Sequence, residues 1–437
     1  MARADGGIAR AEDGTARNGA GAAQPMSHPA QAGGDLARPE NGDARSAARG
    51  TQDQAAAPPA PRWPGTPVGR DEPLLPDFGG ACLTSVVPAI LAQLDGAAEP
   101  PPWLPGPLHG ARQVVLLVLD GLGWEQLEER RAEAPVLASL AGGPLTSVAP
   151  TTTATALTSI VTGLAPAVHG IVGYRLQTVQ GVLNVLRWST PGGDARRTVA
   201  PRSLQSHLAF AGRAVPVVSR AEFAGSGFSE AHLGGTRLHG WRVPSSIGVE
   251  VSALLAAGEP FVYAYYDGID KVAHERGLGE HYLAEVAFVD RLVEDLLRRL
   301  TPGAVLAVTA DHGQVEVTGP PIELGNGERE LVTGLSGEGR FRWLHAKPGA
   351  LEELAALCRE RFSGVAWVRT QHELVDENWF GGPLAPEVAE RLGDLALVAR
   401  APVAFFDPAD TGELRLVARH GSLTSAEMLV PMLAAAP

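Results

Sequence analysis

The sequence has little of what several classes of protein require. Its 437 residues include only two cysteines, Cys82 and Cys358, which lie far apart and match no metal-ligand spacing. This excludes a disulfide framework and a zinc finger. No stretch approaches the roughly 20 apolar residues of a membrane-spanning helix, and no apolar run of signal-peptide length follows Met1. We therefore expect no membrane span and a cytoplasmic location.

Positive charge is also scarce. The chain has 36 Lys and Arg against 49 Asp and Glu, which gives a formal net charge of −13 at pH 7. A protein that wraps a nucleic-acid duplex needs clustered basic residues, so this balance excludes such a partner. A small phosphoester or a free nucleotide needs only one local positive site, so the negative net charge is compatible with such a substrate. The composition does not indicate an oligomeric state.

The chain divides into a tail and a folded part. Residues 1–75 are rich in Ala, Gly and Pro and have no apolar periodicity, which predicts a disordered tail. Residues 76–437 have the strand and helix patterns of a folded domain. Two stretches within it, at about 175–250 and 314–400, are less regular, and we interpret them as insertions.

Three short segments are apolar at nearly every position, as in central parallel strands covered on both faces. Each ends at an aspartate, and helical patterns separate the segments along the chain. This alternation predicts an α/β fold with a mostly parallel central sheet, whose carboxyl edge gathers the acids. The strands are Val114–Leu119, Phe261–Tyr266 and Ala304–Ala310, and the acids are Asp120, Asp267 and Asp311.

Helical spacing is clear in several places. Residues 281–300 form an amphipathic pattern that ends at Pro302, and residues 351–362 form a second one. Near the end of the chain, His420-Gly421 precedes a segment with Met428, Leu429 and Met432, which we expect to be a helix.

A cluster of threonines begins a further predicted helix in the stretch Ser147–Tyr174. The free backbone N–H groups and partial positive charge of a helix start suit a phosphate or sulfate group. Thr153 is therefore a candidate nucleophile. The alternative is that these threonines only cap the helix. Since threonine is not nucleophilic at neutral pH, the functional interpretation needs a metal or a base from elsewhere.

Aspartate and histidine pairs elsewhere supply candidate metal ligands. Asp270 and His274 are four residues apart and would face the same side of a helix, while Asp311 and His312 are adjacent at a strand end. Asp120 and His420 complete a set that two ions can share. Carboxylate and imidazole ligands together favour zinc, or manganese, over magnesium alone. Three alternatives stay open: Asp267 could replace Asp270, His345 could replace His420, and Asp120 could cap the following helix.

These motifs resemble those of the alkaline phosphatase superfamily, in its nucleotide pyrophosphatase and phosphodiesterase branch. The matching segments are LVLDGLG, PTTTATALTSIVTGLAPAVHGI, DKVAHERG, TADHG and the terminal HG, and they cover most of the chain from Asp120 to His420. The resemblance implies an alkaline-phosphatase-like three-layer α/β/α sandwich with the insertions as cap segments. It also implies a metal-dependent hydrolase of phosphodiester or pyrophosphate bonds.

The resemblance also assigns roles to single residues. It implies that Thr153, three residues after Pro150, attacks phosphorus and forms a phosphothreonine intermediate. Members of this branch usually carry an asparagine after the His-Gly turn to bind a phosphoryl oxygen, and this chain has Tyr174 there. The implied metal ligands are Asp270, His274 and His420 for one ion, and Asp120, Asp311, His312 and Thr153 for the other.

Other functions are compatible with parts of this pattern. A phosphomonoesterase would use the same ions and nucleophile with an added positive group, for which Arg175 is the nearest candidate. A sulfatase needs a cysteine or serine nucleophile in a convertible motif, and a phosphoglycerate mutase would have serine at the nucleophile position. The chain could also be a non-catalytic metal-binding protein. The presence of a nucleophile together with six metal ligands disfavours this alternative, because such a protein needs no nucleophile.

Overall fold

The computed structural model describes residues 72–410, 412 and 415–437 of the chain. The predicted disordered tail, residues 1–75, lies outside these residues except at its last four positions. Within the described part, no helix has both the length and the apolar composition that crossing a membrane requires.

The three apolar segments are strands and lie side by side. In the described residues they belong to a seven-stranded sheet, with β1 (Gln113–Leu119) parallel to both β9 (Phe261–Tyr266) and β10 (Ala304–Thr309). β7 and β8 extend the parallel part, while β17 and β2 pair antiparallel at the other edge. The predicted α/β class with a mostly parallel sheet is therefore confirmed. The strands lie in the order β2 (Ala141–Thr146), β17 (Leu429–Ala435), β10 (Ala304–Thr309), β1 (Gln113–Leu119), β9 (Phe261–Tyr266), β7 (Pro216–Arg220) and β8 (Arg237–Trp241).

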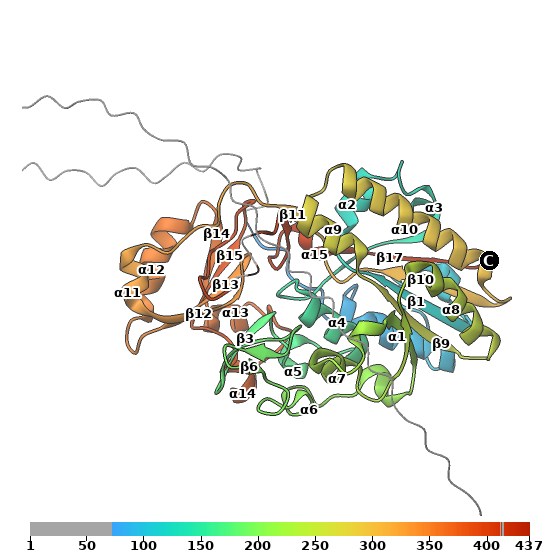
Figure 1. Ribbon diagram of the computed structural model, residues 1–437, viewed down its shortest axis with the longest axis horizontal. Coiled ribbons are helices and arrows are strands. Elements are labelled where there is room, and N and C mark those ends of the chain that lie inside the picture. Colours follow the sequence, from blue (N-terminus) through green and yellow to red (C-terminus); the bar gives the residue numbers. More distant parts are fainter. Residues whose placement is uncertain (1–71, 411, 413–414) are drawn as a thin grey trace, which may run out of the picture. The chain divides into compact units, whose positions relative to one another are not determined.

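Helices cover both faces of this sheet, with α10 (Glu280–Arg299) on one side and α1 (Leu83–Asp95) and α4 (Thr153–Thr162) on the other (Figure 1). The side chains of α10 that are buried keep the helical spacing expected from the sequence, from Val286 to Leu296. The helices of this part of the chain are α1 (Leu83–Asp95), α2 (Trp124–Glu129), α3 (Pro135–Ser139), α4 (Thr153–Thr162), α5 (Pro166–His169), α6 (Pro201–Leu204), α7 (Gly227–Leu233), α8 (Ile247–Ala256), α9 (Gly268–Arg276) and α10 (Glu280–Arg299).

The first irregular stretch contains a small antiparallel sheet outside the central one. β7 and β8 also fall within residues 175–250 but pair with β9 in the central sheet. The segment outside that sheet therefore ends before Pro216 and not at about residue 250. Its strands are β3 (Arg175–Thr178), β4 (Gly181–Asn184), β5 (Ser189–Thr190) and β6 (Gly193–Asp194).

The second irregular stretch forms an antiparallel sheet with its own hydrophobic cluster, in which Leu344, Phe362 and Leu395 are fully buried. A buried ion pair, Arg340 Nε to Glu427 Oε1 at 2.7 Å, connects this sheet to the C-terminal segment. Its elements are β12 (Val332–Glu338), β13 (Phe341–Ala346), β14 (Ala366–Thr370), β15 (Leu395–Ala399), α11 (Asn326–Leu331), α12 (Leu351–Phe362), α13 (Gln371–Asp376) and α14 (Pro386–Ala389).

The expected C-terminal helix is wrong over most of its length. After the two-residue strands β11 (Val315–Glu316) and β16 (Ala418–Arg419), helix α15 (Ser425–Met428) is only four residues long, and β17 begins at Leu429. Pro431 disfavours a helix interior, and the apolar run suits a strand covered on both faces. The pattern of apolar residues alone could not separate these two structures.

Candidate metal centre

The carboxyl ends of β1 and β10 bring Asp120 and Asp311 together, and α9 begins beside them. The backbone N–H of Asp270 donates to the carbonyl of Asp120 at 3.1 Å, and the N–H of Gly121 donates to Asp311 Oδ1 at 3.1 Å. Gly121 has a φ of +78°, and a Cβ there would lie 3.0 Å from the Cα of Asp270. Glycine is therefore needed for β1 to approach α9 this closely.

Two groups of three ligands gather at this edge, and in each group the candidate ligand atoms lie within 4.8 Å of one another. We call Asp120, Asp311 and His312 the buried group. His312 Nε2 lies 3.4 Å from Asp120 Oδ1 and 3.3 Å from Asp311 Oδ2.

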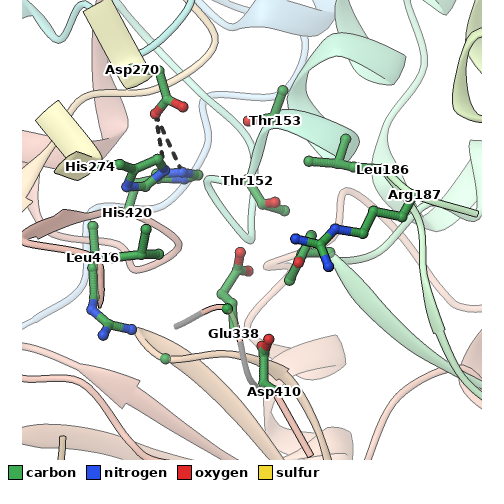
Figure 2. A pocket seen from close by; sticks show the side chains of 14 residues that line it. Thr152, Thr153, Leu186, Arg187, Asp270, His274, Glu338, Asp410, Leu416 and His420 are labelled. Carbon is green, nitrogen blue, oxygen red and sulfur yellow. Dashed lines mark ion pairs between the residues drawn. The ribbon is translucent and has the colours of Figure 1, made fainter. Parts of the chain in front are cut away.

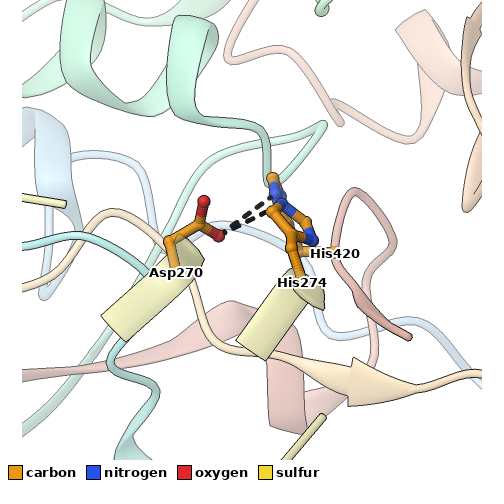
Figure 3. A group of neighbouring side chains, drawn as sticks. All are labelled: Asp270, His274 and His420. Atoms are coloured by element: carbon orange, nitrogen blue, oxygen red, sulfur yellow. Dashed lines mark ion pairs between the residues drawn. The ribbon is translucent and has the colours of Figure 1, made fainter. Parts of the chain in front are cut away.

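The second set, Asp270, His274 and His420, is half-buried, and we call it the outer group. Asp270 and His274 come from consecutive turns of α9, and His420 comes from the loop after β16 (Figure 3). The two Nε2 atoms lie 3.3 Å (His274) and 3.7 Å (His420) from Asp270 Oδ1. All six ligands expected from the sequence thus lie in two neighbouring groups.

The other ring nitrogen of each histidine faces a backbone carbonyl. Nδ1 of His274 lies 2.8 Å from the carbonyl of Ala418, and Nδ1 of His420 lies 2.7 Å from that of Thr151. His312 is similar, with Nδ1 3.1 Å from the carbonyl of Gly313. A neutral imidazole that donates from Nδ1 has a lone pair on Nε2. These lone pairs face carboxylate oxygens, an arrangement that a cation between them would stabilise.

The electrostatics of the site also favour bound cations. Burial, with Asp311 and Asp270 nearby, raises the pKa of Asp120 well above its usual value. Burial and the neighbouring His312 and His274 lower the pKa of His420 well below its usual value, so His420 does not offset the negative charge of the acids. Asp120 Oδ1 and Asp311 Oδ2 are buried without a hydrogen-bond partner among the described residues. The donor set fits two divalent cations with mixed oxygen and nitrogen ligands.

Two polar side chains hold these carboxylates and were missed in the sequence. The hydroxyl of Tyr265, on β9, donates to Asp120 Oδ2, and Gln314 Nε2 donates to Asp270 Oδ1 at 2.6 Å. A buried phenol usually has a hydrogen-bond partner, but this rule does not separate Tyr265 from the other tyrosines of the same strand. Such partners hold metal-binding side chains in a fixed orientation.

Thr153 is the first residue of α4, and its Oγ1 lies 3.2 Å from His312 Nε2. The residue before it, Thr152, is the N-cap but forms no side-chain capping hydrogen bond. Thr151 instead donates to the carbonyl of Ser422 at 2.8 Å and accepts from the N–H of Gly421 at 3.0 Å. The hydroxyls of Thr151, Thr152 and Thr153 therefore do not cap α4. The Thr153 hydroxyl instead lies beside the buried group.

A pocket of about 260 Å³ opens over Thr153 and the outer group (Figure 2). In Figure 2 the outer group faces the pocket from one side and Arg187 faces it from the other, with Thr152 between them. The lining residues are Thr152, Thr153, Tyr174, Leu186, Arg187, Asp270, His274, Glu338, Gly339, Asp410, Gly412, Leu416, Arg419 and His420.

Of the two predicted substrate-binding residues, only one lines this pocket. Tyr174 does, and its hydroxyl accepts a hydrogen bond from Asn184 Nδ2 at 2.6 Å. Arg175 is buried, forms an ion pair with Asp407 and lies 3.5 Å from Asp410. Those carboxylates, over 200 positions away in the chain, occupy the side chain of Arg175, so it does not supply a free positive charge. Two other arginines, Arg187 and Arg419, line the pocket, and the sequence singled out neither.

The other alternative ligands are engaged elsewhere. Both oxygens of Asp267 accept from Arg220 Nε at 2.7 and 2.8 Å, and one also pairs with Lys271 at 2.5 Å. His345 Nε2 lies 2.8 Å from Ser336 Oγ, on the antiparallel sheet. His169 Nδ1 accepts from the N–H of Ile171 at 3.1 Å, a hydrogen bond within its own turn.

Comparisons with known proteins were made at the level of sequence and of structure. The family model described as type I phosphodiesterase / nucleotide pyrophosphatase matches residues 114–423. Among curated proteins, no sequence matches the chain significantly.

Solved structures share the fold. Murine ectonucleotide pyrophosphatase / phosphodiesterase 5 aligns with a TM-score of 0.56 and 17% identity, over 75% of this chain and 88% of that one. Its inactive threonine-to-alanine variant in complex with AMP gives 0.55 and 17%, over 74% and 88%. Phosphonoacetate hydrolase from Sinorhizobium meliloti, in complex with phosphonoformate, gives 0.51 and 17%, over 74% and 90%.

At these identities the structural matches establish an alkaline-phosphatase-like fold. The family model extends further, since it covers most of the described chain, from β1 to the loop after His420. The chain therefore belongs to the type I phosphodiesterase and nucleotide pyrophosphatase family and is an enzyme of that family.

Proposed function

We propose that residues 76–437 form the catalytic domain of a hydrolase of phosphodiester or pyrophosphate bonds that uses two metal ions and Thr153 as nucleophile. The observation that carries this proposal is the position of the Thr153 hydroxyl. It lies 3.2 Å from Nε2 of His312, in the buried group, and lines the same pocket as the outer group. Family membership supports the class of reaction.

The buried group and Thr153 would hold one ion, and the outer group would hold the other. We propose zinc, with manganese as the alternative, because each group combines carboxylate oxygen with imidazole nitrogen. When bound, the two ions supply positive charge that lowers the pKa of an adjacent hydroxyl and offsets the charge on phosphoryl oxygens.

The chain's own residues then account for the chemistry. The Thr153 hydroxyl gives up its proton to solvent, and Oγ1 forms a bond to phosphorus while the bond to the leaving-group oxygen breaks on the opposite side. The leaving oxygen departs as an anion, which takes a proton from water where its basicity requires one. Water hydrolyses the phosphothreonine and restores the free threonine. Since Thr153 is the first residue of α4, N–H groups of the helix start would lie near the phosphoryl oxygens of a substrate bound to it.

We propose a nucleotide or another small phosphoester as substrate. The related murine protein binds AMP in its inactive variant. Tyr174 lines the pocket, and its hydroxyl can donate to a phosphoryl oxygen while it accepts from Asn184. Arg175 does not support the phosphomonoesterase alternative, because its charge is paired with Asp407 and Asp410.

The test is to purify the full chain, measure its bound metals and compare hydrolysis of an aryl diester, an aryl monoester and an aryl sulfate. We expect the diester to be the best substrate and Thr153→Ala to lose turnover by at least about 1,000-fold. Equal turnover by the variant would remove Thr153 from the mechanism. A strong preference for the monoester would contradict the diesterase assignment.

A further inference from the structure

Arg187 stands out among the side chains that line the pocket. Arg187 is exposed, and its guanidinium points into the pocket opposite the outer group (Figure 2). In the part of the chain that the structure describes, this guanidinium forms no hydrogen bond and no ion pair. An arginine in that position offers a fork of N–H donors to a ligand.

The backbone that carries Arg187 is firmly held. The next residue, Trp188, is fully buried, and its indole N–H donates to the carbonyl of Val199 at 2.7 Å. On the other side, Asn184 Oδ1 accepts from the N–H of Arg187 at 3.0 Å, while Asn184 Nδ2 donates to the Tyr174 hydroxyl. One asparagine thus fixes Arg187 relative to Tyr174. This reduces the entropy that Arg187 would lose on binding a ligand.

The remaining charges near the pocket are shared among several groups. Asp410 lies 3.5 Å from Arg175 Nη1, and Arg175 also pairs with Asp407. Asp407 in turn lies 3.6 Å from Arg342 Nη1, so two arginines and two aspartates balance one another. Glu338 and Arg419 also line the pocket with opposite charges. Among the described residues, Arg187 is then a positive charge at the pocket that is left for a ligand.

We propose that Arg187 binds a second phosphate of the substrate, beyond the phosphoryl group that is transferred. The preferred substrates would be phosphoanhydrides such as nucleoside di- and triphosphates, and diesters with an uncharged leaving group would gain nothing from Arg187. This inference rests on the proposed function, because it assumes that the transferred phosphoryl group lies at the outer group and Thr153. Arginine suits the role since its planar fork can bind phosphate in a bidentate manner.

The experiment uses the full chain loaded with zinc, as wild type, Arg187→Gln and Arg187→Lys. Arg196→Gln is the matched control, because Arg196 belongs to the same segment, pairs with Asp194 on the surface and does not line the pocket. Binding of AMP and of ADP is measured by calorimetry. Hydrolysis of thymidine triphosphate is compared with that of the p-nitrophenyl ester of thymidine monophosphate.

We expect wild type and the Arg196 variant to bind ADP more tightly than AMP. Arg187→Gln should reduce this preference by roughly 10- to 100-fold, as for a lost hydrogen bond to a charged group, and Arg187→Lys should recover part of it. For hydrolysis, Arg187→Gln should lower kcat/KM for the triphosphate by a similar factor and that for the nitrophenyl ester by less than about 3-fold.

Two results would overturn the inference while the proposed function stands. One is hydrolysis of both substrates with an unchanged ADP preference in Arg187→Gln, and the other is an equal loss for both substrates. Absence of hydrolysis in wild type, with an ADP preference that depends on Arg187, would support the phosphate site and contradict the proposed reaction.

Discussion

The imidazole rings of His312 and His420 stack with their centroids 3.5 Å apart and their planes 9° apart, although they belong to different ligand groups. The buried group and the outer group are therefore in direct contact through these two rings. Loss of the His420 ring removes a ligand from the outer group and also the packing that holds His312 in the buried group. A comparable loss at His274, which contacts His420 but is not stacked on His312, affects only the outer group directly.

We predict that His420→Ala lowers the affinity for both ions, whereas His274→Ala lowers the affinity for one. The wild type should bind about two ions per chain. Metal content after dialysis, together with calorimetric titration of the metal-free proteins, measures both effects. Identical metal content and binding curves for the two variants would contradict the claim that the His420 ring supports both groups.

Removal of the ions should abolish hydrolysis and reduce thermal stability, because the carboxylates and the Nε2 lone pairs then face one another without a cation. Zinc or manganese should restore activity to the chelator-treated protein. Magnesium alone should restore less, since imidazole is a poor ligand for it. Full activity in excess chelator, or full recovery with magnesium alone, would contradict the assigned donor set.

Tyr265→Phe should weaken metal binding at the buried group by roughly 10- to 100-fold, because the Asp120 carboxylate loses the hydroxyl that orients it. The matched control is Tyr263→Phe, on the same strand and the same face. The hydroxyl of Tyr263 is buried and has no hydrogen-bond partner in the described residues. Metal titrations of the two variants give the comparison, and an equal effect in both would show that Tyr265 does not act through Asp120.

His169 should contribute a pH-dependent part of the stability. Its burial lowers its pKa to about 3, against 6.5 in an exposed histidine. The unfolded chain therefore takes up a proton at this residue before the folded chain does, so the contribution is complete above about pH 6.5 and is lost as the pH falls from there toward 3.

The stability difference between wild type and His169→Gln should accordingly narrow between pH 7.5 and pH 4.5. Thermal unfolding of both metal-free proteins across this range provides the measurement. A difference that stays constant or widens as the pH falls would contradict the buried neutral state of this histidine.

Most of the ligand groups could be predicted because each motif is contiguous and ends a strand or begins a helix. Asp120 and Asp311 follow two strands that lie side by side, and Asp270 and His274 share one face of α9. The choice between Asp267 and Asp270 could not come from spacing, since it depends on Arg220, which lies 47 positions earlier and binds Asp267.

The substrate side of the site was harder to predict for the same reason. Arg175 is adjacent to Tyr174 in sequence, but its charge is used by Asp407 and Asp410, which only the fold brings near. Arg187 lies in a segment without a recognisable motif, and only the buried Trp188 and the contacts of Asn184 place it at the pocket. Long-range pairing of charges decided the outcome for Arg175, whereas buried packing and local hydrogen bonds decided it for Arg187.

The central claim is that the Thr153 hydroxyl attacks phosphorus, and the most direct measurement is detection of its phosphoryl ester. The zinc-loaded enzyme would be mixed with a radiolabelled nucleotide substrate, quenched in acid within a single turnover and digested for peptide mapping. The account predicts label on the peptide that contains Thr153 and none on that peptide from Thr153→Ala. Rapid product formation without any labelled peptide, or label that persists in the Thr153→Ala protein, would contradict it.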